Sequence, residues 1–222
     1  MDSRVLLYPK SATIYSGVRV MKEFRIGQAI EAGPWRITIL EVKESPCMVT
    51  PEGYFQALPT YKIVVVKVRV ENMGPAEGAP FSNNPLPGQS KVTLITPKPE
   101  FVSMKEEERI HAIERMLFEE GKSIEEITNK YPLMSECSKH LSPYAFLHNL
   151  IGRYIERVEV PDKEFLERAL EFKDPICSVN SGKAVEGYML FIIRQDEKPS
   201  MLEIRYNQTL HRGPVTFRVR LV

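Results

Sequence analysis

The chain has 222 residues, of which 30 are Lys or Arg and 29 are Asp or Glu, so its formal net charge is only +1. This near-neutral balance excludes an overall electrostatic attraction to nucleic acid or to an anionic membrane, and such a partner would need a local patch. A chain of this length buries about 70% of its unfolded surface, so it needs no metal or disulfide to hold a core.

The N-terminus carries no recognisable targeting segment. The only apolar run before Pro9 is Val5–Leu7, which is far shorter than a signal-peptide apolar region or the ~20 residues of a spanning helix. We therefore expect no membrane span and, for the chain as written, a cytoplasmic location. If a leader has been removed, the location is instead extracytoplasmic.

Before about residue 97 the sequence alternates as β-strands do. Trp35, Ile37 and Ile39 alternate with polar residues, a period of two that places one face on a core. In Tyr61–Asn72 the even-numbered positions 64 to 70 are all valine, while the opposite face changes from apolar to charged. This pattern predicts a central strand with one face buried throughout and the other face buried at its start and exposed to solvent toward its end. Further strands are expected at Phe24–Ile30 and Lys91–Thr96.

The stretch from Gly74 to Gly88 is rich in proline, which has no N–H to donate to a ladder, so it is predicted to be a loop. We interpret this loop as a long connection rather than a binding rim. The single tryptophan, Trp35, follows Gly33 and Pro34 at the start of a strand. We expect its ring to be buried between two sheets rather than stacked on a ligand.

After residue 99 the period of the sequence changes to that of helices. Ser103 and Glu106 form a Ser-x-x-Glu capping box, and so do Ser123 and Glu126; in such a box the side chains satisfy free backbone N–H groups at a helix start. Two helices are therefore expected to begin there. The first is expected to end near residue 121, at a glycine, and the second before residue 132, a proline.

A third helix is expected over Ser142–Glu159, with Ser142 as its cap and Pro143 at its first position. It ends before Pro161, after which Asp162 is expected to cap one more short helix. One face of the third helix carries a stripe of apolar residues: Leu147, Leu150, Ile151, Tyr154 and Val158.

The end of the chain returns to strand patterns, at Ala184–Arg194, Leu202–Tyr206 and Val215–Val222. These strands have no sheet of their own to complete, so we expect them to pair with the strands of the first region. The predicted fold class is therefore α+β. An immunoglobulin-like antiparallel β-sandwich is built from residues 1–102 and 174–222, and residues 103–173 form a helical insertion between two strands.

The three cysteines, Cys47, Cys137 and Cys177, include no Cys-x-x-Cys pair, so we expect buried free thiols. Cys137, His140 and His148 are weak candidates for a zinc site, for which no fourth ligand is evident. The same residues allow a nucleophilic Cys137 activated by an imidazole, again without a third group to orient it. We accordingly predict no metal, no cofactor and no enzymatic activity.

The order of the predicted helices also allows a helix-turn-helix reader of DNA, with Ser142–Glu159 as the recognition helix and Arg153 and Arg157 on its open face. Two observations argue against this alternative. The connection Pro132–Leu141 is longer than the 3–4-residue turn of that motif. Residues 104–160 contain eleven acids and eight bases, a net of −3, whereas a phosphate-binding surface needs a basic excess.

Four passages carry a family resemblance: Phe24–Ile39, Lys62–Asn72, Lys91–Thr96 and Gly182–Tyr206. They resemble the immunoglobulin-like, telokin-like domain of unknown function that occurs in many bacterial and archaeal surface lipoproteins. In that family a long strand ends in Asn near a Gly, and a Gly-x-x-x-x-Gly-aromatic-x-x-Phe segment begins a late strand. The matching residues here are Asn72, Gly182, Gly187, Tyr188 and Phe191. The resemblance implies a sandwich used for binding or assembly and supplies no catalytic residues.

We therefore predict a non-enzymatic protein-interaction or assembly module, in which the sandwich is the scaffold and the helical insertion is the binding surface. Its partner is expected to be another protein or a second copy of the chain, and the sequence identifies no small-molecule ligand. The residues expected to form an exposed binding patch are Phe146, Leu147, Leu150, Ile151, Tyr154, Arg153 and Arg157.

Overall fold

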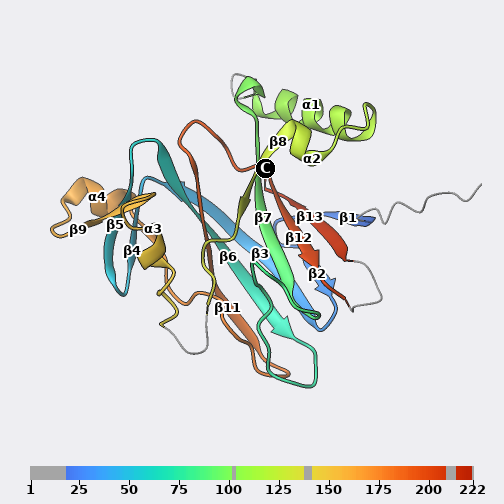
Figure 1. The fold of residues 1–222 in the computed structure, drawn as a ribbon, viewed down its shortest axis with the longest axis horizontal. Helices are drawn as coiled ribbons and strands as arrows, with labels where there is room; N and C mark the ends of the chain where they lie inside the picture. Colours follow the sequence, from blue (N-terminus) through green and yellow to red (C-terminus); the bar gives the residue numbers. More distant parts are fainter. Residues whose placement is uncertain (1–18, 102–103, 138–141, 209–213, 222) are drawn as a thin grey trace, which may run out of the picture.

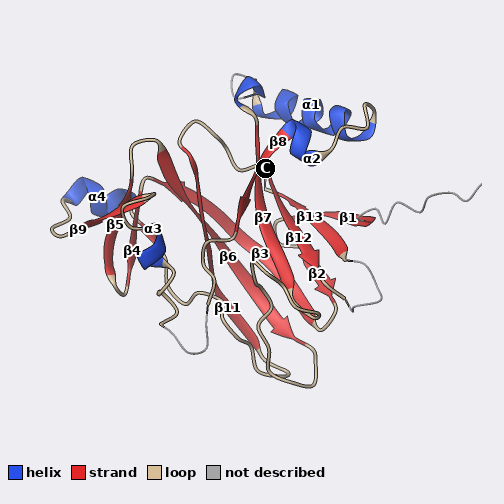
Figure 2. Ribbon diagram, in the orientation of Figure 1, coloured by secondary structure: helices blue, strands red, loops and turns tan. Residues whose placement is uncertain are grey.

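The computed structural model describes residues 19–101, 104–137, 142–208 and 214–221, and their strands form three sheets (Figures 1 and 2). The five-stranded sheet has the order β1 (Arg19–Arg25), β13 (Val215–Arg220), β12 (Met201–Tyr206), β7 (Ser90–Pro97) and β8 (Thr128–Pro132). The central sheet has the order β11 (Ala184–Arg194), β6 (Tyr61–Asn72), β3 (Trp35–Ser45) and β2 (Ala29–Ala32). The small sheet has the order β10 (Leu170–Glu171), β4 (Cys47–Thr50), β5 (Gly53–Ala57) and β9 (Ile155–Val158).

The main core lies between the five-stranded sheet and the central sheet. Val64, Val66, Val68 and Val70 of β6 are fully buried in it, as the alternation of the sequence predicts. Trp35 is buried in the same cluster, and its indole N–H donates to the Gly88 carbonyl over 2.7 Å. The expectation of a tryptophan between two sheets is therefore confirmed, and the protein is a β-sandwich.

A second core lies on the other face of the central sheet. Ile63 and Val65 of β6 point into it and meet Phe55 of the small sheet and Phe172, both of which are fully buried. At Lys67 this face becomes charged, and the ammonium group lies 3.0 Å from the Glu186 carboxylate. The prediction that the second face of this strand is buried only at its start is confirmed, because the small sheet covers only the first part of β6.

The last strands return to the first region as predicted. β11 pairs antiparallel with β6 from Ala184 opposite Glu71 to Arg194 opposite Tyr61, and β12 lies between β7 and β13. The strand expected over residues 24–30 is instead two strands that belong to different sheets. Gly27, with a φ of +85°, turns the chain between them, and its N–H donates to the Ile39 carbonyl over 2.8 Å.

The first helices form near the predicted positions and lie together beyond one end of the five-stranded sheet, with the short 3₁₀ turn η1 (Pro99–Phe101) leading to them (Figure 1). α1 (Glu106–Phe118) begins after Lys105, and Ser103 of the expected capping box lies outside the described residues. The second box is confirmed: the Ser123 N–H donates to Glu126 over 2.6 Å, and the Glu126 N–H donates to the Ser123 hydroxyl over 3.2 Å. However, α2 (Ile124–Ile127) has only 4 residues before the chain enters β8.

The predicted helix over Ser142–Glu159 is wrong. Only α3 (Leu147–Leu150) is helical there; Gly152 turns the chain at a φ of +77°, and the next residues form β9. The recognition helix required for reading DNA is therefore absent. α4 (Lys163–Arg168) follows, and its cap is confirmed, because the Asp162 carboxylate accepts the Phe165 N–H over 2.7 Å.

The segment between β7 and β11 is not wholly helical, contrary to expectation. It contributes β8 to the five-stranded sheet and β9 and β10 to the small sheet. The physical reason is that each of these strands completes a ladder with a strand from the first region. No helix among the described residues is long and apolar enough to cross a membrane.

Candidate functional site

A pocket of about 440 Å³ opens between α3 and the residues that follow β8, and we name it the α3 pocket. Its volume lies in the range typical of ligand sites. Its lining residues are Asn83, Leu133, Met134, Glu136, Cys137, Ser142, Ala145, Phe146, Asn149 and Leu150.

One wall of the α3 pocket is the segment 133–137, which runs along the free edge of β11. The Met134 N–H donates to the Leu190 carbonyl over 2.9 Å, and the Leu190 N–H donates to the Ser135 hydroxyl over the same distance. This segment therefore takes up hydrogen-bonding groups that an edge strand would otherwise leave open.

A disulfide between Cys137 and Cys177 joins this wall to a second segment that covers the same edge. The Tyr188 N–H of β11 donates to the Asp174 carbonyl over 3.2 Å, and a Cβ added at Gly187 would lie 2.2 Å from that carbonyl oxygen. The expectation of free thiols is thus wrong for Cys137 and Cys177, because both segments converge on β11.

The rim of the α3 pocket carries a carboxylate held by neutral groups. Glu136 accepts hydrogen bonds from the Ser82 hydroxyl over 2.9 Å, from the Asn83 N–H over 3.2 Å and from the Asn83 side-chain amide over 3.1 Å. The Asn83 Oδ1 atom is buried and has no hydrogen-bond partner within the described part of the chain. No Lys, Arg or His stands among the described lining residues.

The residues predicted to form an exposed apolar patch are mostly core. Phe146, Leu147 and Leu150 are 8%, 1% and 5% exposed, because they belong to the second core beneath the small sheet. Ile151 is exposed, whereas Tyr154 is half-buried against another tyrosine ring. The contiguous patch is therefore absent, but Phe146 and Leu150 do form the floor of the α3 pocket.

The two predicted arginines lie apart from the α3 pocket. Arg153 is exposed in the turn before β9. The Arg157 guanidinium donates to the Glu52 carbonyl over 3.1 Å and lies 5.6 Å from the centre of the Phe55 ring. Neither residue stands on an open helix face as the DNA-binding alternative required.

The weak zinc and nucleophile predictions are overturned at Cys137, because a sulfur in a disulfide is neither a thiolate ligand nor a nucleophile. His148 is exposed on α3, and His140 lies outside the described residues. In the part of the chain that the structure describes, no group of three or more His, Cys, Asp or Glu side chains could hold a metal ion.

Sequence reasoning missed Asn83 and Glu136 as site residues. Asn83 lies in the proline-rich loop that we interpreted as a plain connection, and its link to Glu136 spans 53 residues of sequence. An available signal was that Glu136 is an acidic residue directly beside a cysteine, in a connection too long for a simple turn.

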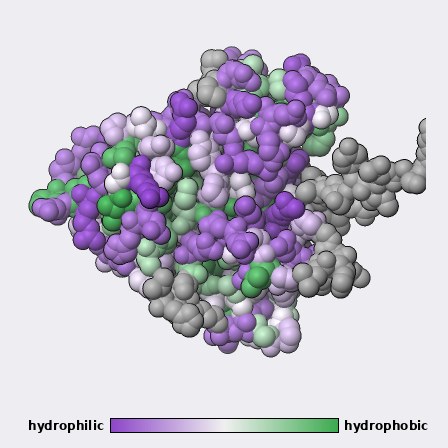
Figure 3. Space-filling model, viewed as in Figure 1, coloured by the Kyte–Doolittle hydropathy of each residue, from purple (hydrophilic) through white to green (hydrophobic). Residues whose placement is uncertain are grey.

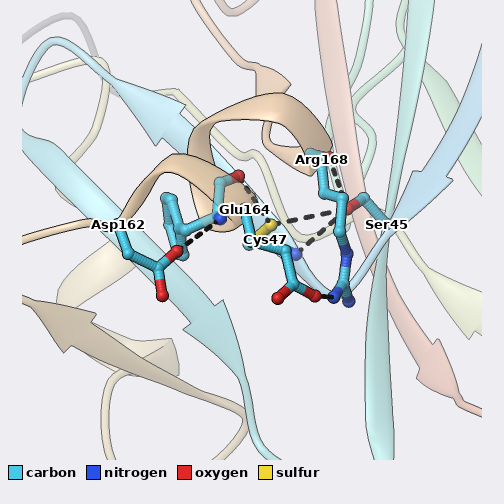
Figure 4. A network of polar contacts seen from close by, with 6 residues as sticks. Ser45, Cys47, Asp162, Glu164 and Arg168 are labelled. Carbon is cyan, nitrogen blue, oxygen red and sulfur yellow. Dashed lines mark hydrogen bonds and ion pairs between the residues drawn. The ribbon is translucent and has the colours of Figure 1, made fainter.

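A second cavity, of about 230 Å³, lies between β4 and α4. Figure 4 shows the polar network in its wall. The Ser45 hydroxyl donates to the Arg168 carbonyl over 2.7 Å, and the Cys47 thiol donates to the Phe165 carbonyl over 3.5 Å. The Arg168 guanidinium donates to Glu164 over 2.8 Å. Cys47 is the buried free thiol expected from the sequence, and its contacts fasten α4 to the small sheet.

Apolar side chains are exposed at this end of the molecule. Val160 is 86% exposed and Leu166 is 51% exposed, and Figure 3 shows apolar atoms at the left end of a largely hydrophilic face. Single exposed apolar residues are common on protein surfaces. We therefore place the candidate site at the α3 pocket, where apolar floor and polar rim coincide.

A buried carboxylate ties the end of β11 to β8. Glu197 is 0% exposed and accepts hydrogen bonds from the Tyr131 hydroxyl and, over 2.8 Å, from the Asn129 amide. Burial raises the pKa of the Tyr131 phenol well above its ordinary value, and the hydrogen bond to Glu197 raises that pKa further. The phenol is therefore neutral at physiological pH and donates to the carboxylate.

We expect the free energy of unfolding to fall as the pH rises above about 10, the ordinary tyrosine pKa, because the unfolded chain then loses the Tyr131 proton before the folded chain does. Tyr131→Phe should make the alkaline fall shallower. At neutral pH it should cost about 1–3 kcal/mol, because Glu197 loses a donor. Urea unfolding from pH 7 to 11.5 measures both effects. Tyr54→Phe in β5 is the control, and an unchanged alkaline slope in Tyr131→Phe would contradict the assignment.

The comparisons with known proteins concern the fold. No protein-family model and no curated protein matches the chain. A crystal structure of an uncharacterized β-sandwich protein from Clostridium difficile 630 aligns with a TM-score of 0.46 and 11% identity, covering 97% of this chain and 100% of that chain. The yjhA protein from Bacillus subtilis aligns with a TM-score of 0.40 and 11% identity, covering 89% and 98%.

Proposed function

We propose that this protein is a non-enzymatic protein-interaction module whose sandwich is the scaffold and whose residues between β7 and β11 build the binding surface. The observation that carries the proposal is the α3 pocket, in which Phe146 and Leu150 form an apolar floor beneath the Glu136 carboxylate. No serine or cysteine stands beside an imidazole among its described lining residues. The pocket provides a concave apolar surface and hydrogen-bond acceptors, which suit it to binding a side chain of a partner protein.

For the compartment, we propose the extracytoplasmic alternative. The support is the Cys137–Cys177 disulfide, because structural disulfides persist in oxidising environments and are rare in the cytosol. It fixes a wall of the α3 pocket, so the proposed binding function depends on the oxidised state. This location is also the one implied by the resemblance to domains of surface lipoproteins.

The roles of the matching residues support membership in the telokin-like family as a proposal. The Asn72 amide donates to the Ala76 and Val179 carbonyls, each over 2.8 Å, and so fixes the turn after β6. Gly182 has a φ of +68°, and its N–H donates to the Asn72 carbonyl over 2.8 Å. The asparagine and the glycine that carry the resemblance thus hold one junction, between the end of β6 and the start of β11.

The proposed function predicts that filling the α3 pocket abolishes partner capture. Ala145→Trp places an indole in the pocket, because Ala145 lines it, whereas His148→Trp on the exposed side of α3 is the matched control. Tagged proteins of both variants and of the wild type are used to capture partners from extracts of the native host. We expect the amount of one specific partner captured to fall on the order of tenfold or more for Ala145→Trp and to stay unchanged for His148→Trp.

Both variants must first show native thermal unfolding, so that lost capture is not a folding defect. Sedimentation of the purified proteins separates a foreign partner from a second copy of the chain, because self-association would be lost in the same variant. If Ala145→Trp captures the same proteins as the wild type in equal amounts, the pocket is not the interaction surface.

A further inference from the structure

We propose that the α3 pocket receives a basic side chain, Lys or Arg, of the partner protein, with its charged end on Glu136 and its methylene stem on the apolar floor. This inference rests on the proposed function, because it names the chemistry that the same pocket recognises.

Among the residues that the structure describes, no base in the pocket balances the charge of Glu136. Its contacts are with Ser82 and Asn83, which are neutral, and the described lining residues include no base. Some carboxylates elsewhere on the surface do have a cationic neighbour, such as Glu71 beside Arg36 at 2.9 Å. The neutral donors fix the position of the Glu136 carboxylate without cancelling its net charge.

The Asn83 side chain fixes the position of the Glu136 carboxylate. A carboxylate only accepts hydrogen bonds, so the amide nitrogen of Asn83 must face Glu136, and the Oδ1 atom is left without a partner. The rim is therefore an acceptor site that favours a cation over a neutral donor.

The floor of the pocket suits the stem of such a side chain. Leu133, Phe146 and Leu150 are each less than a tenth exposed and present an apolar wall. Lys and Arg cover apolar surface with their methylene groups while the charged end stays at a polar rim. A purely apolar side chain would cover the Glu136 carboxylate without pairing it, which costs free energy, and an acidic one would be repelled.

Two small probes test this chemistry directly on the full protein. N-acetyl-lysine-N-methylamide and N-acetyl-norleucine-N-methylamide share the stem and differ by the ammonium group, and the arginine analogue tests the other base. Each is titrated into labelled protein at 20 mM salt while the backbone amide resonances are followed. We expect the lysine and arginine probes to shift the resonances of residues 134–137 and 145–150. We further expect them to bind about fivefold more tightly than the norleucine probe.

Glu136→Gln should remove this preference, whereas Glu156→Gln, an exposed carboxylate on β9 that does not line the pocket, should keep it. Raising the salt to 500 mM on the wild-type protein should weaken the preference without any substitution, so the test does not depend on the variant's folding. Equal binding of lysine and norleucine probes overturns the inference but leaves the proposed function standing. Absence of binding by every probe overturns the inference, and unchanged capture by Ala145→Trp overturns the proposed function.

Discussion

Reduction of the Cys137–Cys177 disulfide is expected to lower the free energy of unfolding by about 4 kcal/mol and the thermal midpoint by roughly 8–16 °C. The two cysteines are 40 residues apart in sequence, and opening a loop of that size returns conformational entropy to the unfolded chain. Thermal unfolding followed by circular dichroism, with and without dithiothreitol, measures the change. The double variant Cys137→Ser, Cys177→Ser should unfold at the midpoint of the reduced wild-type protein.

The same double variant is the control for the reductant. It retains only Cys47, which is a free thiol, so dithiothreitol should not shift its midpoint. Hydrogen exchange gives a second readout, because the Leu190 and Tyr188 amides donate to the two segments that the disulfide joins. Their exchange should accelerate on reduction more than that of β3 amides. A thermal midpoint that does not change on reduction would contradict both the predicted contribution of the disulfide to stability and the proposed oxidising compartment.

The sandwich was predictable because its signals are local and repeated. Side-chain alternation predicts the buried valines of β6, the change from an apolar to a charged face at Lys67, and the three late strands. Each is found in the structure. The Ser123 capping box was likewise readable, since both of its partners lie within one helical turn. Features of this kind need no knowledge of distant residues.

The helix expected over Ser142–Glu159 failed for a physical reason. Leu147, Leu150 and Tyr154 recur at helical spacing because all three meet the second core, yet α3 and the strand after it reach that core from two directions. Gly152, in the left-handed region, allows the chain to turn between them. A period of 3.6 thus identified the apolar positions, but both the helix and the exposed patch predicted from them are wrong, because these residues pack into the second core.

The candidate site was only half predictable for the same reason. Phe146 and Leu150 were named as binding residues, although in an exposed patch rather than in a pocket, whereas the rim joins Asn83 to Glu136 across 53 residues of sequence. The disulfide is also long-range, because Cys137 and Cys177 meet only where two segments cover the edge of β11. Pairings of this kind depend on the tertiary fold and leave no local pattern in the sequence.

Phe172→Ala is expected to cost about 3–5 kcal/mol and to loosen the small sheet before the sandwich. The Phe172 ring is 0% exposed, and its centre lies 5.8 Å from that of Phe146, with Tyr144 and Tyr188 at 6.3 and 6.4 Å. Truncation removes these edge-to-face contacts and leaves a cavity in the second core. Urea unfolding measures the loss, and Phe118→Ala, at a ring that is 64% exposed, should change stability by at most about 0.5 kcal/mol.

The position of Phe172 links this stability change to binding. The Phe172 ring contacts that of Phe146, which forms part of the floor of the α3 pocket. Phe172→Ala should therefore weaken binding of the lysine probe even where the chain remains folded. Hydrogen exchange should rise in β4, β5 and β9, while the amides of β6 and β11, which pair with each other, stay protected. Uniform loss of protection across all three sheets would show instead that the second core is inseparable from the sandwich. The α3 pocket would then belong to one cooperatively unfolding unit rather than to a layer, the small sheet and its core, that opens by itself.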